Sequence, residues 1–270
     1  MMPLRLRRSG AIVLRQLYLV RGSVARALPL FAWVAVDVVL WGFITKYLNT
    51  FARAGYDFVP VLLGAVLLWD FLGRVMQGVT MAFLEDVWSR NFLNVFATPI
   101  TIGEYVAGLV ASSIATSVIG LGVMVVLAGA LFGLSVSVYG AAFAPFLLLL
   151  FTFGVALGIF GSALVLRLGP ASEWFVWPIP ALLSPFAGVF YPLSTLPPWA
   201  RVIGYALPPA YVFEGMRDVL AHGSLSPTPL LGGGALALAY LALASWFFVR
   251  VHRYAVRTGL IARYSAETVS

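Results

Sequence analysis

The chain has 270 residues, of which 61% are hydrophobic and 10% are charged, and its mean hydropathy is +0.98. Because a soluble domain has roughly 25% charged residues, this composition excludes a soluble domain and indicates an integral membrane protein. The absence of cysteine excludes disulfides and thiolate metal sites, and the net charge of +7 is explained better by arginines on the cytoplasmic side of a membrane than by nucleic-acid binding.

Residues 1–27 are predicted to form a basic amphipathic helix that lies in the membrane interface. Its apolar side carries five residues at helical spacing: Val13, Leu17, Val20, Val24 and Leu28. Arg8, Arg15 and Arg26 fall on another side, where we expect them to face anionic headgroups. The alternative is a disordered basic leader; a signal peptide is disfavoured because arginines interrupt every apolar run.

Apolar runs of about 20 residues predict an all-α fold with six membrane spans. They lie near 28–48, 59–83, 105–132, 138–166, 174–194 and 228–250. Twelve Arg residues fall on the side of both termini, against four Arg and Lys on the other side. We therefore place both termini in the cytoplasm and expect one membrane domain over 1–270, with the six-span bundle at 28–250 and a basic tail at 251–270.

Three ionisable residues lie inside predicted spans, where each costs about 2.5–3.5 kcal/mol at mid-helix. Asp37 stands near the middle of the first span without a local partner. Asp70 and Arg74 stand four residues apart on one face of the second span. All three are candidates for lining a polar pathway, and Asp37 is the strongest of them. For Asp70 and Arg74 we favour a structural ion pair, and the corresponding alternative for Asp37 is a bond to a neighbouring span.

The segment between the second and third spans, LEDVWSRNFLNVFATPITIGEYV, predicts a short cytoplasmic helix between about 87 and 97. Pro99 ends this helix, and Thr101 with Glu104 predicts a capping box that begins the next one. The short helix bears Trp88, Phe92, Leu93, Val95 and Phe96. We interpret it as a docking surface; alternatively, its aromatic residues lie in the membrane interface.

Small residues at a spacing of four mark the third and fourth spans, as Gly108, Ser112, Thr116 and Gly120, and as Gly154, Gly158 and Ser162. Such stripes allow helices to approach closely, so we interpret them as scaffold.

The fifth span contains three prolines, Pro178, Pro180 and Pro185, which disfavour a continuous helix. Its aromatic residues Trp177, Phe186, Phe190 and Tyr191 are candidates for a pathway wall, whereas Trp174 is expected to face lipid. The proline-rich residues 196–220 that follow predict short helices that enter the membrane from outside without crossing it; an ordinary outer loop is the alternative.

In their order and spacing, these features resemble the ABC type-2 exporter permease family over essentially the whole chain. Two stretches carry the resemblance, LEDVWSRNFLNVFATPITIGEYVAG at 84–108 and GVFYPLSTLPPWARVIGYALPPAYVFEGMRDVL at 188–220. The resemblance implies a permease dimer, which we expect to be a homodimer, above two separate ATP-binding subunits. It implies a coupling helix near 89–97, with the coupling residues Glu85, Arg90, Asn91, Phe92, Leu93, Val95, Phe96 and Pro99.

The sequence has no G-x-x-x-x-G-K-[ST] motif, and its single lysine, Lys46, lies in an outer loop. We therefore expect no enzyme activity, cofactor or metal in this chain, with ATP and Mg²⁺ bound by the partner subunit. A membrane-embedded enzyme is disfavoured because neither His222 nor His252 lies within a span. A secondary transporter is disfavoured because the second span is not broken as the fifth is.

The expected substrate is drug-like or amphipathic, with a polysaccharide or lipid-linked glycan as the alternative. The expected location of the protein is the plasma or inner membrane.

Overall fold

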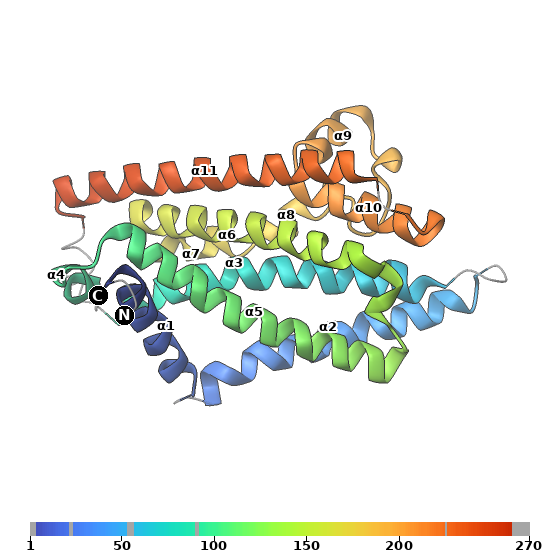
Figure 1. The fold of residues 1–270 in the computed structure, drawn as a ribbon, viewed down its shortest axis with the longest axis horizontal. Helices are drawn as coiled ribbons and strands as arrows, with labels where there is room; N and C mark the ends of the chain where they lie inside the picture. Colours follow the sequence, from blue (N-terminus) through green and yellow to red (C-terminus); the bar gives the residue numbers. More distant parts are fainter. Residues whose placement is uncertain (1–3, 22–23, 53–56, 90–91, 225, 261–270) are drawn as a thin grey trace.

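The computed structural model describes residues 4–21, 24–52, 57–89, 92–224 and 226–260, and every element within them is a helix. The long helices run side by side along the bundle (Figure 1). In chain order the elements are α1 (Leu4–Arg21), α2 (Val24–Asn49), η1 (Val59–Leu63), α3 (Gly64–Trp88), α4 (Phe92–Ala97), α5 (Ile102–Phe132), η2 (Val136–Ala142), α6 (Phe143–Leu168), η3 (Pro170–Ser172), α7 (Glu173–Val176), α8 (Ile179–Leu183), η4 (Leu193–Thr195), α9 (Pro198–Tyr205), α10 (Pro208–His222) and α11 (Pro227–Thr258).

Four helical segments among the described residues are long and apolar enough to cross a membrane: Val59–Trp88, Ile102–Phe132, Val136–Leu168 and Pro227–Thr258. They coincide with the second, third, fourth and sixth predicted spans, so the chain is a multi-pass, all-helical membrane protein. The first predicted span corresponds to α2, a helix of 26 residues. The six-span count remains a prediction, because the fifth span is not one long helix.

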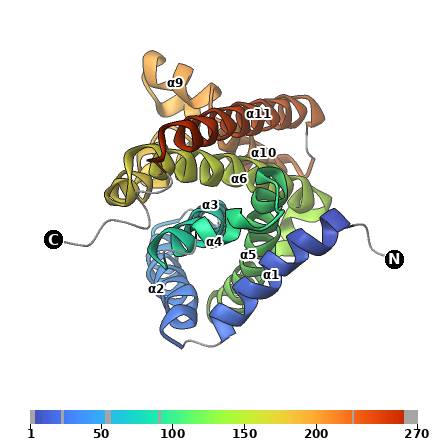
Figure 2. The same ribbon diagram turned by 90° about the vertical axis from the view of Figure 1, so that its left-hand side faces the viewer.

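Helix α3 lies at the centre of the bundle (Figure 2). It packs against α5 on one side and α6 on another, while α11 covers α6, and α1 and α2 border α5. Small residues permit the close approach of α3 and α6, since a Cβ atom on Gly158 would lie only 2.7 Å from the Cβ of Val79. The hydroxyl of Ser113 on α5 donates to the carbonyl of Val75 at 2.9 Å. The small-residue stripes therefore serve as helix contacts, as predicted.

The predicted break in the fifth span is confirmed. Helix α7 has only four residues and α8 only five, with Pro178 between them, because proline lacks the N–H that a continuing helix needs. The chain then turns at Gly188, whose φ of +65° favours glycine. The expected extent of this span, 174–194, is therefore wrong, since helix ends well before residue 194.

The short helices α9 and α10 lie at the end of the bundle opposite to α1 and α4 (Figure 1). They occupy the residues for which the sequence predicted short helices, 196–220. Both begin with proline in the first turn, where the missing N–H costs nothing. The two ends of the molecule thus differ in construction, and each carries its own set of polar contacts.

Candidate functional site

The segment between α3 and α5 forms the short helix α4, Phe92–Ala97, at one end of the bundle (Figure 1). The sequence predicted that this helix starts near residue 87. That start is wrong, because Val87 and Trp88 belong to the last turn of α3. The Trp88 side chain is 49% exposed. Helix α3 continues this far because its apolar periodicity reaches Val87, which is buried against the core.

The predicted coupling residues occupy different parts of this segment. Glu85 is half-buried on the last turn of α3, Val95 packs partly against the core, and Pro99 is exposed after α4. Arg90 and Asn91 lie outside the described residues. The remaining three, Phe92, Leu93 and Phe96, belong to α4, and their side chains lie outside the described part of the structure.

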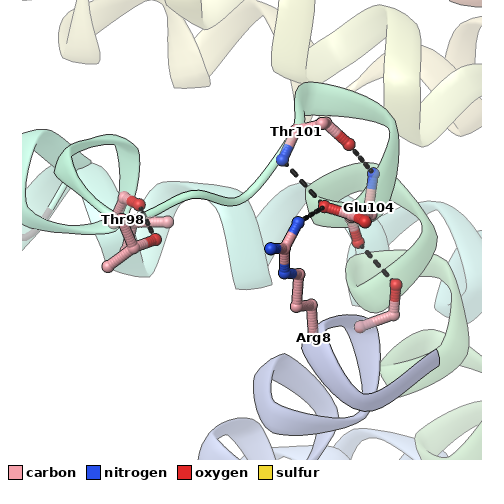
Figure 3. A network of polar contacts seen from close by, with 6 residues as sticks. Arg8, Thr98, Thr101 and Glu104 are labelled. Atoms are coloured by element: carbon pink, nitrogen blue, oxygen red, sulfur yellow. Dashed lines mark hydrogen bonds and ion pairs between the residues drawn. The ribbon is translucent and has the colours of Figure 1, made fainter. Parts of the chain in front are cut away.

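The start of α5 is fixed by the capping box that the sequence predicted (Figure 3). The backbone N–H of Thr101 donates to the Glu104 carboxylate at 2.9 Å, and the N–H of Glu104 donates to the Thr101 hydroxyl at 3.3 Å. Just before it, the hydroxyl of Thr98 donates to the carbonyl of Val95 at 2.5 Å. These local bonds fix the chain on both sides of Pro99 and so orient α4 relative to α5.

Helix α1 is bound to the same corner of the bundle. The Arg8 guanidinium lies 3.5 Å from the Glu104 carboxylate, and the hydroxyl of Ser9 donates to the Glu104 carbonyl at 3.0 Å (Figure 3). Ile12 is buried against Gly108 of α5. The expectation that the arginines face lipid headgroups is therefore wrong for Arg8, because an acidic residue of the bundle lies within reach of it.

A second ion pair of α1 reaches deeper. The Arg15 guanidinium donates to the carboxylate of Asp86, which is completely buried near the end of α3. The other carboxylate oxygen accepts a 2.7 Å hydrogen bond from the hydroxyl of Tyr105 on α5, which is also completely buried. Arg15 therefore also departs from the headgroup prediction. A single cluster joins α1, α3 and α5 beside α4, and its ion pair holds the charge of the buried carboxylate.

The observed α1 is shorter than the predicted helix over 1–27, since it ends at Arg21 and α2 begins at Val24. Two residues assigned to its apolar side, Val24 and Leu28, thus belong to α2. The sequence interpretation also missed Asp86 and Tyr105. The only local sign was an acidic residue directly after Glu85 in an apolar stretch, which does not identify Arg15 as the partner.

The three ionisable residues within the spans form one group. Arg74 on α3 interacts electrostatically with both Asp70 and Asp37, although Asp37 lies on α2. Asp37 thus has an interhelical partner that its local sequence does not reveal. The Arg74 side chain lies along α5, where a Cβ on Gly120 would meet its Cδ at 3.1 Å. These charges lie at the junction of α2, α3 and α5.

The aromatic residues predicted for a pathway wall are dispersed along the broken segment. Phe190 stacks on Trp41 of α2, with ring centroids 4.7 Å apart. Phe186 meets Trp199 of α9 edge to face at 6.2 Å. The hydroxyl of Tyr191 donates to the Pro185 carbonyl at 2.6 Å, and Trp177 is 43% exposed.

Two further polar residues, which the sequence interpretation did not include, hold the opposite end of the bundle. Glu214 on α10 accepts the backbone N–H of Leu193 at 2.7 Å. Arg217, one turn later, donates to the carbonyl of Gly188 at 2.6 Å and to Glu214 at 3.2 Å. These contacts fasten α10 to the turn that ends the broken fifth segment.

Within the described ranges, no three His, Asp or Glu residues gather closely enough to hold a metal ion. A comparison with known protein families matches residues 23–221 to the family described as ABC-2 type transporter. The match extends from the start of α2 to the end of α10, and so includes α4 and the charged group within the membrane. A search of curated proteins found no match. The chain therefore belongs to the ABC-2 type transporter family, whose membrane domain is the permease component of the transporter.

Proposed function

We propose that this chain is the membrane subunit of an ATP-driven exporter in the plasma or inner membrane, with both termini in the cytoplasm. Two copies form the translocation pathway, and two separate subunits bind ATP and Mg²⁺ and dock on α4. The substrate is a drug-like or amphipathic small molecule.

The observation that carries this proposal is the attachment of α4. The capping box at Thr101 fixes its connection to α5, and α1 is bound beside it through Glu104 and Asp86. A force applied to α4 by a docked subunit would act on α5 and α3 together, because hydrogen bonds and a buried ion pair connect them. Such a connection is what transmission of a conformational change to the spans requires.

The experiment compares copurification and ATPase activity for two substitution sets in the full complex. Phe92→Asp with Phe96→Asp places charges on α4, and we expect loss of the ATP-binding subunit, or ATP hydrolysis that no longer drives transport, while the chain still inserts into the membrane. The matched control is Tyr205→Asp on α9, an exposed aromatic at the opposite end of the bundle. It should retain the partner.

Normal transport by the doubly substituted α4 would overturn the docking assignment. A wild-type chain that purifies alone and changes no ATPase rate would overturn the exporter proposal itself, and a secondary transporter would replace it.

A further inference from the structure

The charged group at the junction of α2, α3 and α5 lies at the middle depth of the bundle. Asp37 is central in α2, and Asp70 and Arg74 stand 11 and 15 residues after the start of the segment Val59–Trp88. At about 1.5 Å per residue, these positions lie roughly 16 and 22 Å along that segment. Both carboxylates interact electrostatically with the single guanidinium of Arg74.

Two buried oxygen atoms, one on α3 and one on α5, have no hydrogen-bond partner among the described residues. One is Oδ2 of Asp70 and the other is Oγ of Ser117, whose side chain is 1% exposed. On the same helix as Ser117, the hydroxyls of Ser112 and Thr116 both donate to backbone carbonyls of α5, whereas that of Ser117 does not. A buried polar group left unsatisfied costs about 1–3 kcal/mol, so each of these oxygens favours a donor that can reach it.

Ser117 lies on the side of α5 that packs against α3. On the same side of α5, Ser113 one turn earlier bonds to Val75 of α3. Gly120, on the following turn, lies against Arg74. Ser117 lies between these two contact points on the same face of α5, and so near the level of Arg74.

The face of α3 beside the charges is open. A Cβ atom on Gly73 would meet nothing within 4 Å, and Gln77 is exposed, although α3 is the central helix. One turn further along, Gln77 also borders a shallow apolar depression with room for about one water molecule, lined by Met76, Met81, Trp177 and Pro180 among others. The charged group and an apolar surface are therefore neighbours along one face of α3.

We propose that Asp37, Asp70 and Ser117 bind the protonated amine of an amphipathic cation, whose apolar body lies along the open face of α3 at Gly73 and Gln77. This assignment of the substrate class rests on the proposed export function. A primary ammonium has three N–H donors and no acceptor, which matches carboxylate and hydroxyl oxygens that lack donors. An anion is disfavoured, because the one guanidinium is flanked by two carboxylates.

The test uses three probes that share one apolar body: 2-(2-naphthyl)ethylamine, 2-(2-naphthyl)ethanol and 2-naphthylacetate. Equilibrium binding to the purified permease without any partner measures the site, and ATPase stimulation of the complete transporter in proteoliposomes measures its use. We expect the amine to bind and stimulate, and the alcohol and the carboxylate to do so at least about tenfold more weakly, a ratio that corresponds to about 1.4 kcal/mol.

Asp37→Asn and Asp70→Asn should each raise the dissociation constant of the amine about tenfold or more, and Ser117→Ala less. The matched control is Asp218→Asn, an exposed acid on α10, which should bind the amine as the wild type does. Because Asp70 is mostly buried and its variant could misfold, half-buried Asp37 gives the deciding measurement.

Equal binding of the three probes, or equal binding by Asp37→Asn and Asp218→Asn, would overturn the cation site. Amine binding that depends on Asp37 but never alters an ATPase rate would support the site and contradict the exporter function, so the two failures are distinguishable.

Discussion

Arg8 and Arg15 of α1 each contact an acidic residue. The two acidic residues differ in the hydrogen-bond partners that they would keep if the arginine were removed. Asp86 is completely buried, with Arg15 and Tyr105 as its side-chain partners. Glu104 keeps the N–H of Thr101 as a partner even without Arg8. Removing Arg15 would thus leave a buried charge with one hydroxyl donor, whereas removing Arg8 would leave a carboxylate that the capping box still satisfies.

Arg15→Gln should therefore destabilise the protein more than Arg8→Gln. Breaking a buried ion pair costs about 3–5 kcal/mol, and the 30% exposure of Arg15 places its loss at the lower end of this range. For Arg8 we expect about 0–1 kcal/mol, as for a surface pair. Thermal unfolding of the detergent-purified protein measures the order.

A second substitution, Asp86→Asn in the Arg15→Gln background, should recover part of the lost stability, because it removes the orphaned charge. Equal unfolding temperatures for Arg15→Gln and Arg8→Gln would contradict the buried contact.

At the scale of elements, the bundle depends on how closely α3 and α6 approach each other. Gly158 lies against Val79 and against the carbonyl of Met76, which a Cβ atom would meet at 2.8 Å. The hydroxyl of Thr80 bridges the same contact by donating to the Gly158 carbonyl at 3.3 Å. Lipid offers no hydrophobic driving force between helices, so this close packing is a main source of α3–α6 association.

Gly158→Ala should consequently lower the unfolding temperature, with a cost of about 1–3 kcal/mol for overpacking. The matched control is Gly122→Ala on α5, where a Cβ atom would meet nothing within 4 Å. It should cause no loss, since alanine is the better helix former by about 1 kcal/mol. An unchanged unfolding temperature for Gly158→Ala would mean that the two helices separate without penalty.

For the whole molecule, the two ends of the bundle define the orientation in the membrane. Helices α1 and α4 lie at one end, and α9 and α10 lie at the other (Figure 1). Ser89, which ends α3 just before α4, and Ser194, in η4 just before α9, are both exposed. The excess of arginine in the N-terminal segment and the tail is the basis for our proposal that the first end faces the cytoplasm. The natural chain has no cysteine, so an introduced one is the only thiol.

In intact cells, Ser194→Cys should react with a membrane-impermeant maleimide, whereas Ser89→Cys should react only after permeabilisation. Labelling is read as a mass shift of the purified chain. Reversed accessibility would invert the proposed topology, and equal accessibility before permeabilisation would contradict an orientation with these residues on opposite sides.

The structural features that depend only on residues close together in the chain could be predicted from the sequence. Long apolar runs specify membrane helices because unsatisfied backbone groups are too costly in lipid. The capping box at Thr101 needs only a residue three positions away, and Pro178 interrupts the fifth segment because it has no N–H to donate. The order of these local features also sufficed to identify the ABC-2 type transporter family.

Tertiary structure alone decided which distant charges meet. Arg15 and Asp86 are 71 residues apart, and Asp37 reaches Arg74 only because α2 lies near α3. No periodicity encodes such pairs, because a charge in a low-dielectric environment is stabilised by whichever partner the fold brings within reach. The same reason explains why α1, which by composition resembles an interfacial helix, instead binds the acids of the bundle.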